Sequence, residues 1–494
     1  MLFNSLDFLI FFPIVVFVYF IVPKKIRYLW LLGASYYFYM SWNAKYAILI
    51  AISTIITWLS GMLIGRIKKT GWKKTIVAAS LLSNLGILFF FKYFDFAITS
   101  LNEVLSRFDF QIIDRKFDVL LPVGISFYTF QALSYTLDVY RGEIEEEKNF
   151  LKYALFVSFF PQLVAGPIER SKNLVSQIKK IETINVWNYE RIINGLIMMA
   201  WGLFQKMVIA DRMAIFVNEV FDHAYQYGTI ELILAAVGFA IQIYCDFAGY
   251  STIAIGAARV MGFDLMENFN TPYFATSIGD FWHRWHISLS SWFRDYVYIS
   301  LGGNRCSKVR KYVNVFITFL VSGLWHGASW TFVIWGALHG FYQIIGLLLK
   351  PIRQKITKIF HVNTNAFSFE FGQILITFSL TTFAWIFFRA ESLKAAITYI
   401  KQMVTHWNPW VLFDKSMYAI ALNETECKVL LAAVCFLLIV DLLKRVKNTN
   451  LSDFLIQQNL WFRWAVVIAL LMSILIYGIY GIQFDSTKFI YFDF

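Results

Sequence analysis

The chain has 494 residues, of which 58% are hydrophobic and only 15% are charged. A soluble domain averages about 45–50% apolar and about 25% charged residues, so the composition excludes an ordinary soluble protein. The net charge of +12 arises from lysines and arginines that lie beside apolar segments. Such clusters are typical of membrane-protein loops and argue against nucleic acid as a partner. We therefore expect a multi-pass protein of the lipid bilayer.

Apolar segments follow one another along the whole chain. A helix needs about 20 residues to cross the hydrocarbon core, and several of these segments are shorter. We expect an all-α, polytopic fold with about eleven transmembrane helices, in which Tyr28–Met40 and Tyr153–Val164 are tilted, extended by polar residues or re-entrant. The expected spans are Asp7–Val22, Tyr28–Met40, Tyr46–Ile64, Ile76–Phe94, Val119–Leu137, Tyr153–Val164, Leu196–Val217, Leu232–Ala254, Val313–His326, Ser329–Leu349, Gly372–Phe388, Val429–Leu443 and Trp464–Ile482.

The first basic loops set the expected orientation. Lys24, Lys25 and Arg27 follow the first apolar segment, and five more lysines and arginines lie between residues 66 and 74. Placing both clusters in the cytoplasm leaves the N-terminus outside. No linker, internal repeat or low-complexity tract divides the chain, so residues 1–494 are expected to form a single integral membrane domain.

Two stretches in the first half of the chain interrupt the apolar pattern. In Pro122–Gln131, the polar side chains Ser126, Thr129 and Gln131 are candidates to line a passage. Phe159–Ile168 contains two prolines and a glycine, which break a regular helix. Broken helices at membrane depth are tolerated where they are buried or line a cavity, and a purely structural kink explains the pattern equally well.

The region Asn270–Arg305 is too polar to span a membrane and too aromatic for a solvated loop. Aromatic residues of this kind favour the membrane–water boundary, so the region is expected to lie along the interface or to re-enter the membrane. On a helix, Asp280 and Arg284 stand four apart and favour an ion pair. His286 and Ser290 would share another face. An interfacial helix held by tryptophans and surface ion pairs accounts for this pattern equally well.

The end of this region adds a charged pair and a turn. Arg294 and Asp295 are followed by Gly302–Arg305, a flexible and basic segment that could meet a phosphate-bearing donor. His283 and His286 are three residues apart, but no HExxH pattern or third ligand accompanies them, so no metal is expected. No phosphate-binding loop, dinucleotide fingerprint or Gly-x-Ser-x-Gly motif is present, so no bound cofactor is expected either.

The apolar segment around residue 326 carries the strongest single signal. His326 lies in Gly323–Trp330, among small residues that allow close helix packing. An ionisable residue inside a membrane is a functional-site hypothesis by default, and histidine suits general acid–base work near neutral pH. The alternative is a neutral histidine hydrogen-bonded within the helix bundle. His339 lies thirteen residues later, about 220° around a continuous helix, so it is expected to be structural.

Taken together, these residues resemble the membrane-bound O-acyltransferase family, and specifically its bacterial branch with the alginate O-acetyltransferase membrane subunit. The resemblance rests on PVGISFYTFQALSYTLDVY, FFPQLVAGPIER, the block from Asp280 to Arg305, GLWHG and WIFFRA. It runs from the first helix to the last and assigns the family core to residues 119–390. It implies a multi-helix fold with a central tunnel that admits an acyl donor from the cytoplasmic side.

The resemblance also implies roles for individual residues. In the family, the histidine of the LWHG block is the catalytic one, which is His326 here. The last residue of the WHRWH block, His286, is the second functional histidine and would orient the acceptor or polarise the acyl carbonyl. His283 matches no required family role. The remaining candidates for the tunnel wall, or for positioning donor and acceptor, are Arg284, Trp285, Ser290, Asp295, Asn304, Arg305 and Trp325.

The implied reaction is transfer of an acetyl group from a cytoplasmic thioester, with acetyl-CoA as the expected donor substrate. His326 would act as general base on the attacking hydroxyl. Holding both reactants in a tunnel would remove part of the entropy cost of their encounter. Relatives in this branch pass the acetyl group to a separate extracytoplasmic or membrane-anchored acetyltransferase that modifies a polysaccharide, so such a partner is expected. The expected location is the bacterial cytoplasmic membrane.

Three other functions remain open on the sequence. D-alanyl transfer for teichoic acid modification belongs to the same superfamily and takes its donor from a small carrier protein. A transporter or flippase of an acylated carbohydrate would use the histidines as proton relays. A scaffold that only anchors a surface transferase would need neither histidine for activity.

Overall fold

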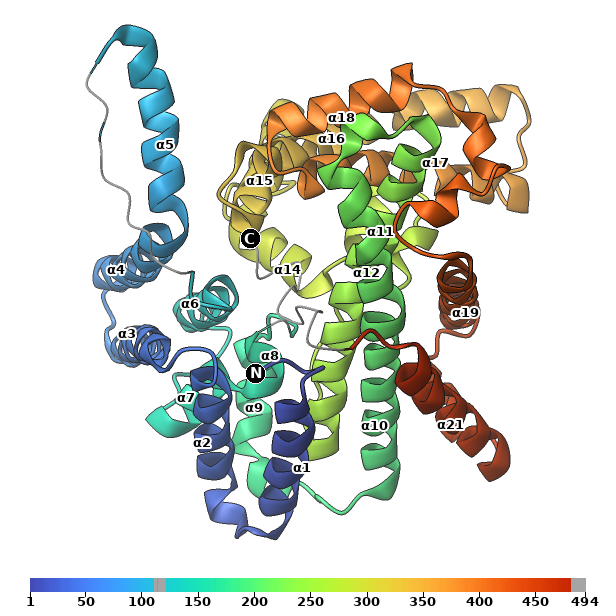
Figure 1. Ribbon diagram of the computed structural model, residues 1–494. Coiled ribbons are helices and arrows are strands. Elements are labelled where there is room, and N and C mark those ends of the chain that lie inside the picture. Colours follow the sequence, from blue (N-terminus) through green and yellow to red (C-terminus); the bar gives the residue numbers. More distant parts are fainter. Residues whose placement is uncertain (111–112, 114–120, 165, 481–494) are drawn as a thin grey trace. The chain divides into compact units, whose positions relative to one another are not determined.

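The computed structural model describes residues 1–480 apart from 111–112, 114–120 and 165 (Figure 1). Within these residues the regular secondary structure is helical and no β-strand occurs, so the all-α prediction is confirmed. Backbone contacts divide the described chain into two compact units, one of residues 1–199 and 253–266, the other of residues 200–252 and 267–480. The single domain expected from the sequence stays a prediction.

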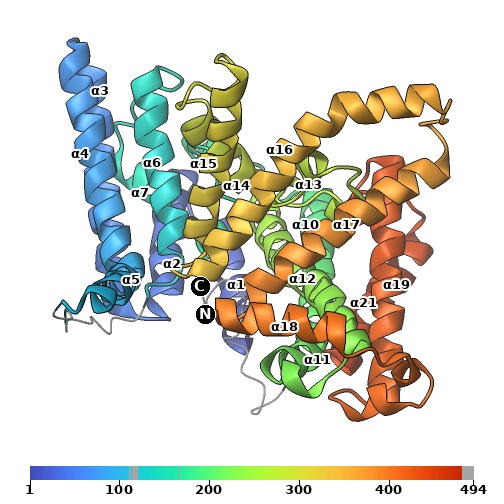
Figure 2. The same ribbon diagram turned by 90° about the horizontal axis from the view of Figure 1, so that it is seen from above.

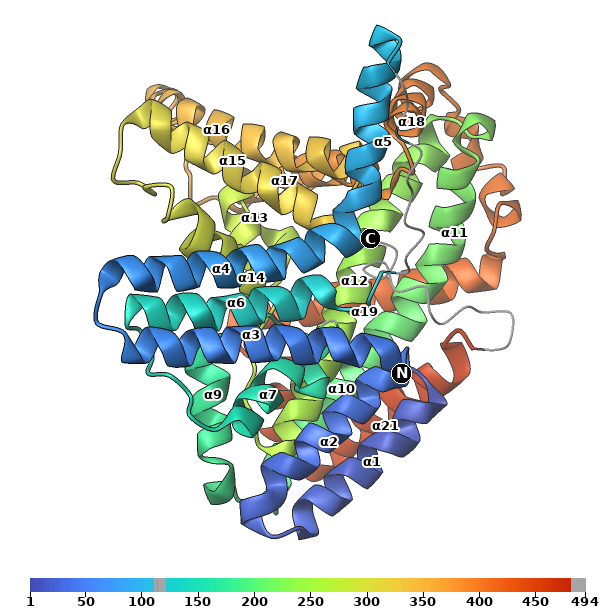
Figure 3. The same ribbon diagram turned by 90° about the vertical axis from the view of Figure 1, so that its left-hand side faces the viewer.

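The first unit follows the predicted apolar segments. Its helices are α1 (Leu6–Ile21), α2 (Arg27–Met40), α3 (Ala47–Arg66), α4 (Thr70–Leu88), α5 (Phe94–Leu105), α6 (Ile125–Arg141), α7 (Phe150–Ser158), α8 (Phe160–Leu163), α9 (Ser171–Lys179) and most of α10 (Tyr189–Phe204). The helices α1 and α2 lie side by side in Figure 1. The helices α3, α4 and α6 form a layer that Figures 2 and 3 show from two sides.

The predicted helix break in Phe159–Ile168 is confirmed. The helix α7 ends at Ser158, and α8 begins at Phe160 with Pro161 in its first turn. Two buried side-chain amides satisfy one carbonyl of the interrupted backbone, because Gln131 Nε2 and Gln162 Nε2 both donate to Phe156 O, at 2.6 and 3.0 Å. A break that buried donors satisfy is tolerated at membrane depth. The passage expected along Pro122–Gln131 stays a prediction.

A buried carboxyl group fastens a loop of the first unit. Glu169, just before α9, is fully buried. It accepts hydrogen bonds from the backbone N–H of Met266 and from Asn173 Nδ2, the latter at 2.8 Å. Burial raises the pKa of Glu169 to about 7, against the opposing effect of these hydrogen bonds. The carboxyl group therefore titrates close to neutral pH.

The second unit begins within α10. Its helices are α11 (Asp211–Asp222), α12 (Thr229–Met261) up to residue 252, α13 (Ile278–Arg284), α14 (Ile287–Trp292), α15 (Lys308–His326), α16 (Trp330–Ile359), α17 (Phe367–Arg389), α18 (Leu393–Thr405), α19 (Glu424–Lys447), α20 (Leu451–Ile456) and α21 (Leu460–Tyr477). The helices α15 and α16 form a hairpin, and α17 lies beside α16 (Figure 3). A glycine permits this close pairing, since a Cβ on Gly323 would lie 2.3 Å from Phe332 O.

Three charged side chains of the second unit are buried beside a π-helical segment of the chain. A π-helical segment, η6 (Gln205–Ala210), joins α10 to α11. Lys206 Nζ lies 2.9 Å from Asp211 Oδ1 and 2.5 Å from Asp246 Oδ1 of α12. All three residues are at most 3% exposed. Removing a single charge from water into the protein interior carries a large desolvation cost. The attraction between the ammonium group and the two carboxylates offsets this cost.

Seven helical stretches of the described chain are long and apolar enough to cross a membrane. They are Ala44–Arg66, Thr70–Phe108, Tyr189–Asp222, Thr229–Met261, Trp330–Ile359, Phe367–Arg389 and Leu460–Tyr477. The polytopic class is thereby confirmed, whereas the expected count of about eleven is not. Two of the other expected spans show why. The helix α2 has only 14 residues, and α15 carries three basic residues in its first turn.

The aromatic region Asn270–Arg305 is a series of short helices, not one amphipathic helix. The segments η8 (Pro272–Phe274), α13, α14 and η9 (Phe293–Tyr298) follow one another along it. The predicted ion pair is confirmed, with Arg284 Nε 2.8 Å from Asp280 Oδ1. The one-helix arrangement behind the expected His286–Ser290 face is wrong, because α13 ends before His286 and α14 begins after it.

Candidate active site

His326 ends α15 at the tip of the α15–α16 hairpin. Gly327 leaves the helix in an extended conformation, and the side chain of Ser329 caps the start of α16. The helix therefore stops at its run of small residues, and His326 is buried, with 3% of its surface exposed. The imidazole contacts three aromatic rings at centroid distances of 5.0, 4.9 and 5.4 Å, which belong to Trp325, Trp335 and Phe388.

His286 lies between α13 and α14 with a strained backbone. Its φ of 41° and ψ of 55° fall in the left-handed region, which costs a residue with a Cβ roughly 1–2 kcal/mol. Strain of this kind persists only where the surroundings enforce it, and it concentrates at functional sites. The ring lies edge-on to Phe247, with centroids 4.6 Å apart. Complete burial lowers the pKa of His286 to about 3, so the imidazole is neutral at neutral pH.

Trp325 connects the two predicted catalytic histidines. Its ring centroid lies 6.1 Å from that of His286 and 5.0 Å from that of His326, and both contacts are edge-on. Two histidines forty residues apart in the sequence therefore share one neighbour within the second unit. The structure brings these residues together, while their catalytic roles stay predictions.

His339 belongs to the same aromatic cluster. Trp282 Nε1 donates to its Nδ1 at 3.2 Å, and Trp335 lies between it and His326, with centroids 5.0 and 4.9 Å from the two imidazoles. The different facing expected of His326 and His339 applies only where one continuous helix carries both residues. That geometry is wrong, because the chain reverses at Gly327 and folds α16 back along α15.

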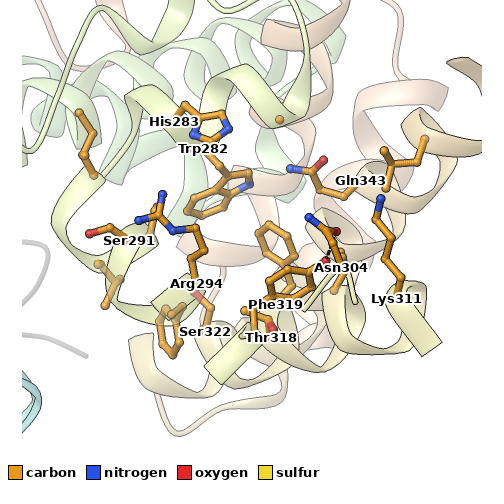
Figure 4. Close-up of a pocket in the computed structure, with 18 residues that line it drawn as sticks. Trp282, His283, Ser291, Arg294, Asn304, Lys311, Thr318, Phe319, Ser322 and Gln343 are labelled. Carbon is orange, nitrogen blue, oxygen red and sulfur yellow. Dashed lines mark hydrogen bonds between the residues drawn. The ribbon is translucent and has the colours of Figure 1, made fainter. Parts of the chain in front are cut away.

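A cavity of about 440 Å³ lies against this cluster (Figure 4). Trp282, the hydrogen-bond donor to His339, forms part of its wall. Two other lining residues are close to the histidines in sequence. Ile287 directly follows His286, and Ser322 precedes His326 by about one helical turn. The cavity is therefore bounded by the segments that carry both histidines.

Basic and polar side chains surround the same cavity. Figure 4 shows His283, Arg294 and Lys311 around the space, together with Asn304, whose Oδ1 accepts from the hydroxyl of Tyr298 at 2.7 Å. Of the residues selected from the sequence, Ser290 and Asn304 line the cavity, and so does the unassigned His283. Much of the remaining lining is apolar, which suits a ligand with an aliphatic part and an anionic part.

The other charged candidates do not line the cavity. Arg284 is held by Asp280, and Asp295 pairs with Arg294 at 2.8 Å, so Asp295 contacts a lining residue. Arg305 is exposed on the turn that follows η9. No group of three or more His, Cys, Asp or Glu side chains in the described ranges is arranged to hold a metal ion.

Several aromatic residues of the cluster escaped the sequence reasoning. Trp285, a predicted wall residue, is fully buried and lies 5.0 Å from Trp385 between ring centroids. Trp385 in turn stacks on Trp335 at 5.5 Å, and Phe388 contacts His326. A signal existed, because Trp335 and His339 stand four apart and Trp385 and Phe388 three apart, which places each pair on one helix face.

A helical membrane protein with buried histidines beside a mixed apolar and basic cavity has the parts of a membrane-embedded transferase. The chain belongs to the membrane-bound O-acyltransferase family, whose family model matches residues 68–388, more than half of the chain. The matched range begins earlier than the core expected from the sequence and ends close to the same point. The protein is therefore an acyltransferase of the membrane.

Individual relatives narrow the comparison. The chain is 40% identical to the probable alginate O-acetylase AlgI of Pseudomonas aeruginosa over 400 residues, 80% of this chain and 73% of the relative. It is 37% identical to the peptidoglycan O-acetyltransferase of Helicobacter pylori over 404 residues, 76% of this chain and 73% of the relative. It is 30% identical to the teichoic acid D-alanyltransferase of Bacillus subtilis over 224 residues, 44% of this chain and 56% of the relative.

Proposed function

We propose that this protein takes an acetyl group from a cytoplasmic thioester, acetyl-CoA, and passes it across the bacterial cytoplasmic membrane for O-acetylation of an extracytoplasmic polysaccharide. The final transfer runs through a partner acetyltransferase that is extracytoplasmic or anchored in the membrane. The names of the O-acetylating relatives support this proposal, since each is matched over 73% of its length.

The observation that carries the proposal is the pair of buried histidines around Trp325. His326 accepts the proton of the attacking hydroxyl while the oxygen forms a bond to the acyl carbon. The carbon–sulfur bond then breaks, and His326 returns the proton to the leaving thiolate. His286, neutral at neutral pH because of its burial, donates a hydrogen bond to the acyl oxygen or to the acceptor. A dry site strengthens both interactions.

The cavity beside the cluster is the proposed donor site. Acetyl-CoA combines a flexible arm, in which aliphatic stretches alternate with amides, with phosphate groups, and His283, Arg294 and Lys311 provide basic partners around the mainly apolar space. Placing the phosphates near these side chains directs the thioester toward the segments that carry His286 and His326. Because Arg294 already pairs with Asp295, Lys311 is the better single probe of this contact.

D-alanyl transfer is the second candidate function. The match to teichoic acid D-alanyltransferases supports it, but it covers 44% of this chain, against 80% for the alginate relative. The two candidates differ in the donor, because D-alanyl transfer draws on a carrier protein. Acetyl transfer from free acetyl-CoA favours the first candidate, and strict dependence on a charged carrier protein favours the second.

Reconstitution in proteoliposomes tests the proposal. Radiolabelled acetyl-CoA is supplied on one side, and fragments of alginate or peptidoglycan on the other, with and without a co-expressed partner transferase. We expect label on protein or glycan only when acetyl-CoA reaches the cytoplasmic side. Absence of labelling with every acceptor, in protein that still binds acetyl-CoA, would contradict the proposal.

The direction of transfer depends on the orientation predicted from the basic loops. Single cysteines at positions 25, 43 and 69, in a background without the four native cysteines, report it through labelling from outside intact cells. We expect labelling at position 43 and none at 25 or 69. Strong external labelling at position 69 would reverse the orientation and the direction of transfer.

A further inference from the structure

The segment that precedes η8 runs alongside the turn that contains His286. The N–H of Ile287 donates to Asn268 O, and the N–H of Asn270 donates to Arg284 O, both at 2.9 Å. These two hydrogen bonds bracket the left-handed backbone of His286. They hold both ends of the turn, so the strained residue has fixed neighbours on either side.

The side chain of Asn268 adds a second set of contacts. Its Oδ1 accepts from Ser288 Oγ at 2.6 Å and from the Ser288 N–H at 3.4 Å. Its Nδ2 donates to Ser251 Oγ of α12 at 3.0 Å. Asn268, Ser251 and Ser288 are at most 2% exposed. Hydrogen bonds in such a low-dielectric setting are stronger than in water, and losing one partner is correspondingly costly.

This network replaces a missing helix cap. His286 occupies the N-cap position of α14, where Ser, Thr, Asp or Asn usually accepts a hydrogen bond from the first turn. Within the described chain, the His286 side chain makes no capping hydrogen bond. Asn268 supplies the acceptors instead, through its carbonyl oxygen to Ile287 and its amide oxygen to Ser288. The imidazole can therefore lie against Phe247 and Trp325 without fraying the helix.

We infer that Asn268 is a positioning residue that holds the imidazole of His286 in the active site by clamping the backbone that follows it. The inference rests on the function proposed above for His286. Loss of the Asn268 side chain leaves the two backbone hydrogen bonds in place but removes its contacts to Ser288 and Ser251, so the left-handed backbone is held less firmly and relaxes toward an ordinary conformation. The ring then leaves its place beside Trp325, although Asn268 itself touches neither ring.

A double-mutant cycle in the reconstituted full-length protein tests the inference. We expect Asn268→Ala to lower kcat at least about tenfold, because a misplacement of about 1 Å has effects of this size or larger. The KM for acetyl-CoA should change less than about twofold, since the clamp does not line the donor cavity. In the His286→Ala background, Asn268→Ala should cause no further loss. Losses that simply multiply would overturn the inference.

Conservative variants separate positioning from general destabilisation. Asn268→Asp keeps an oxygen for Ser288 and offers a second oxygen to the hydroxyl of Ser251, so it should recover most of the kcat lost in Asn268→Ala. Ser251→Ala is the matched control, because it leaves the contacts to Ser288 intact, and we expect a kcat within about threefold of wild type. If Asn268→Ala does not fold, Ser288→Ala replaces it in the cycle. A kcat of Asn268→Asp as low as that of a folded Asn268→Ala would contradict the clamp.

The outcomes keep the two proposals apart. Full activity of a folded His286→Ala protein would overturn the role proposed for His286, and the inference with it. An inactive His286→Ala protein beside a folded and fully active Asn268→Ala protein would overturn the positioning inference alone.

Discussion

Two clusters of the second unit place polar side chains in the protein interior, and each offsets the cost of their burial in a different way. Lys206 is held between Asp211 and Asp246, so charges compensate charges at 2.5–2.9 Å. The histidine cluster places imidazoles against aromatic rings, and burial keeps His286 neutral. An ammonium group held between two carboxylates has its hydrogen bonds already taken, whereas a neutral imidazole can donate a hydrogen bond through one ring nitrogen and accept one through the other. We therefore expect the first cluster to contribute to stability and the second to the proposed chemistry.

The largest effect on activity should come from a change in the histidine cluster. His326→Gln keeps much of the shape and a hydrogen-bonding end, but it removes the proton carrier. We expect acyl transfer to fall by about 10²–10⁴-fold, while expression and acetyl-CoA binding persist. Turnover by purified protein with donor and acceptor measures the loss. Near-normal turnover would show that His326 is structural, and would contradict the difference in role expected between the two clusters.

The charge cluster should respond in stability. Lys206→Met leaves two carboxylates buried without their cation, and removing one partner of a buried ion pair costs about 3–5 kcal/mol. We expect a marked fall in thermal stability in detergent, measured by the loss of monodisperse protein on heating. Lys428→Met is the matched control, since the Lys428–Glu424 pair is exposed on α19 and should contribute nothing measurable. Equal stabilities of the two variants would refute the assignment.

A smaller effect is expected at the donor cavity. Lys311→Gln removes one basic group from the lining, and we expect the KM for acetyl-CoA to rise about three- to tenfold, equivalent to about 1 kcal/mol, with kcat little changed. Arg310→Gln, on the neighbouring residue that does not line the cavity, is the control. A KM that shifts equally in both variants would mean that the cavity does not hold the phosphates.

The smallest effect concerns Glu169, a buried carboxyl group held by hydrogen bonds. Its pKa is raised to about 7 in the folded protein, from an ordinary value of 4.5, so the folded state binds the proton more tightly. Its contribution to stability is therefore full below about pH 4.5 and is lost as the pH rises through about 7. We expect the melting temperature of wild type to fall from about pH 5 to 8 by a few degrees more than that of Glu169→Gln. Parallel melting curves across this range would disprove the shift.

Sequence patterns identified the candidate site residues better than the contacts that hold them in place. The motifs singled out His286 and His326, and the prolines of Phe159–Ile168 predicted a real break. The place of His339 was missed because its distance from His326 depends on a reversal at Gly327, which spacing along one helix cannot represent.

The clamp on His286 lies outside the reach of such patterns for a related reason. Asn268 caps a helix that begins nineteen residues later, so no local capping signal exists. The expected count of about eleven spans is not confirmed, because a short helix such as α2 falls below the usual crossing length and the pattern of its residues does not show how it is accommodated.

The place of His326 at the tip of the α15–α16 hairpin affects how the centre is built during synthesis. Trp325, Trp335 and His339 lie within fourteen residues of His326, and contacts so close in sequence form early because their loops lose little entropy. Trp385 and Phe388 belong to α17 and follow His326 by 59 and 62 residues along the chain. During synthesis His326 therefore precedes the aromatic residues of α17, so the aromatic contacts around it are complete only once α17 has inserted.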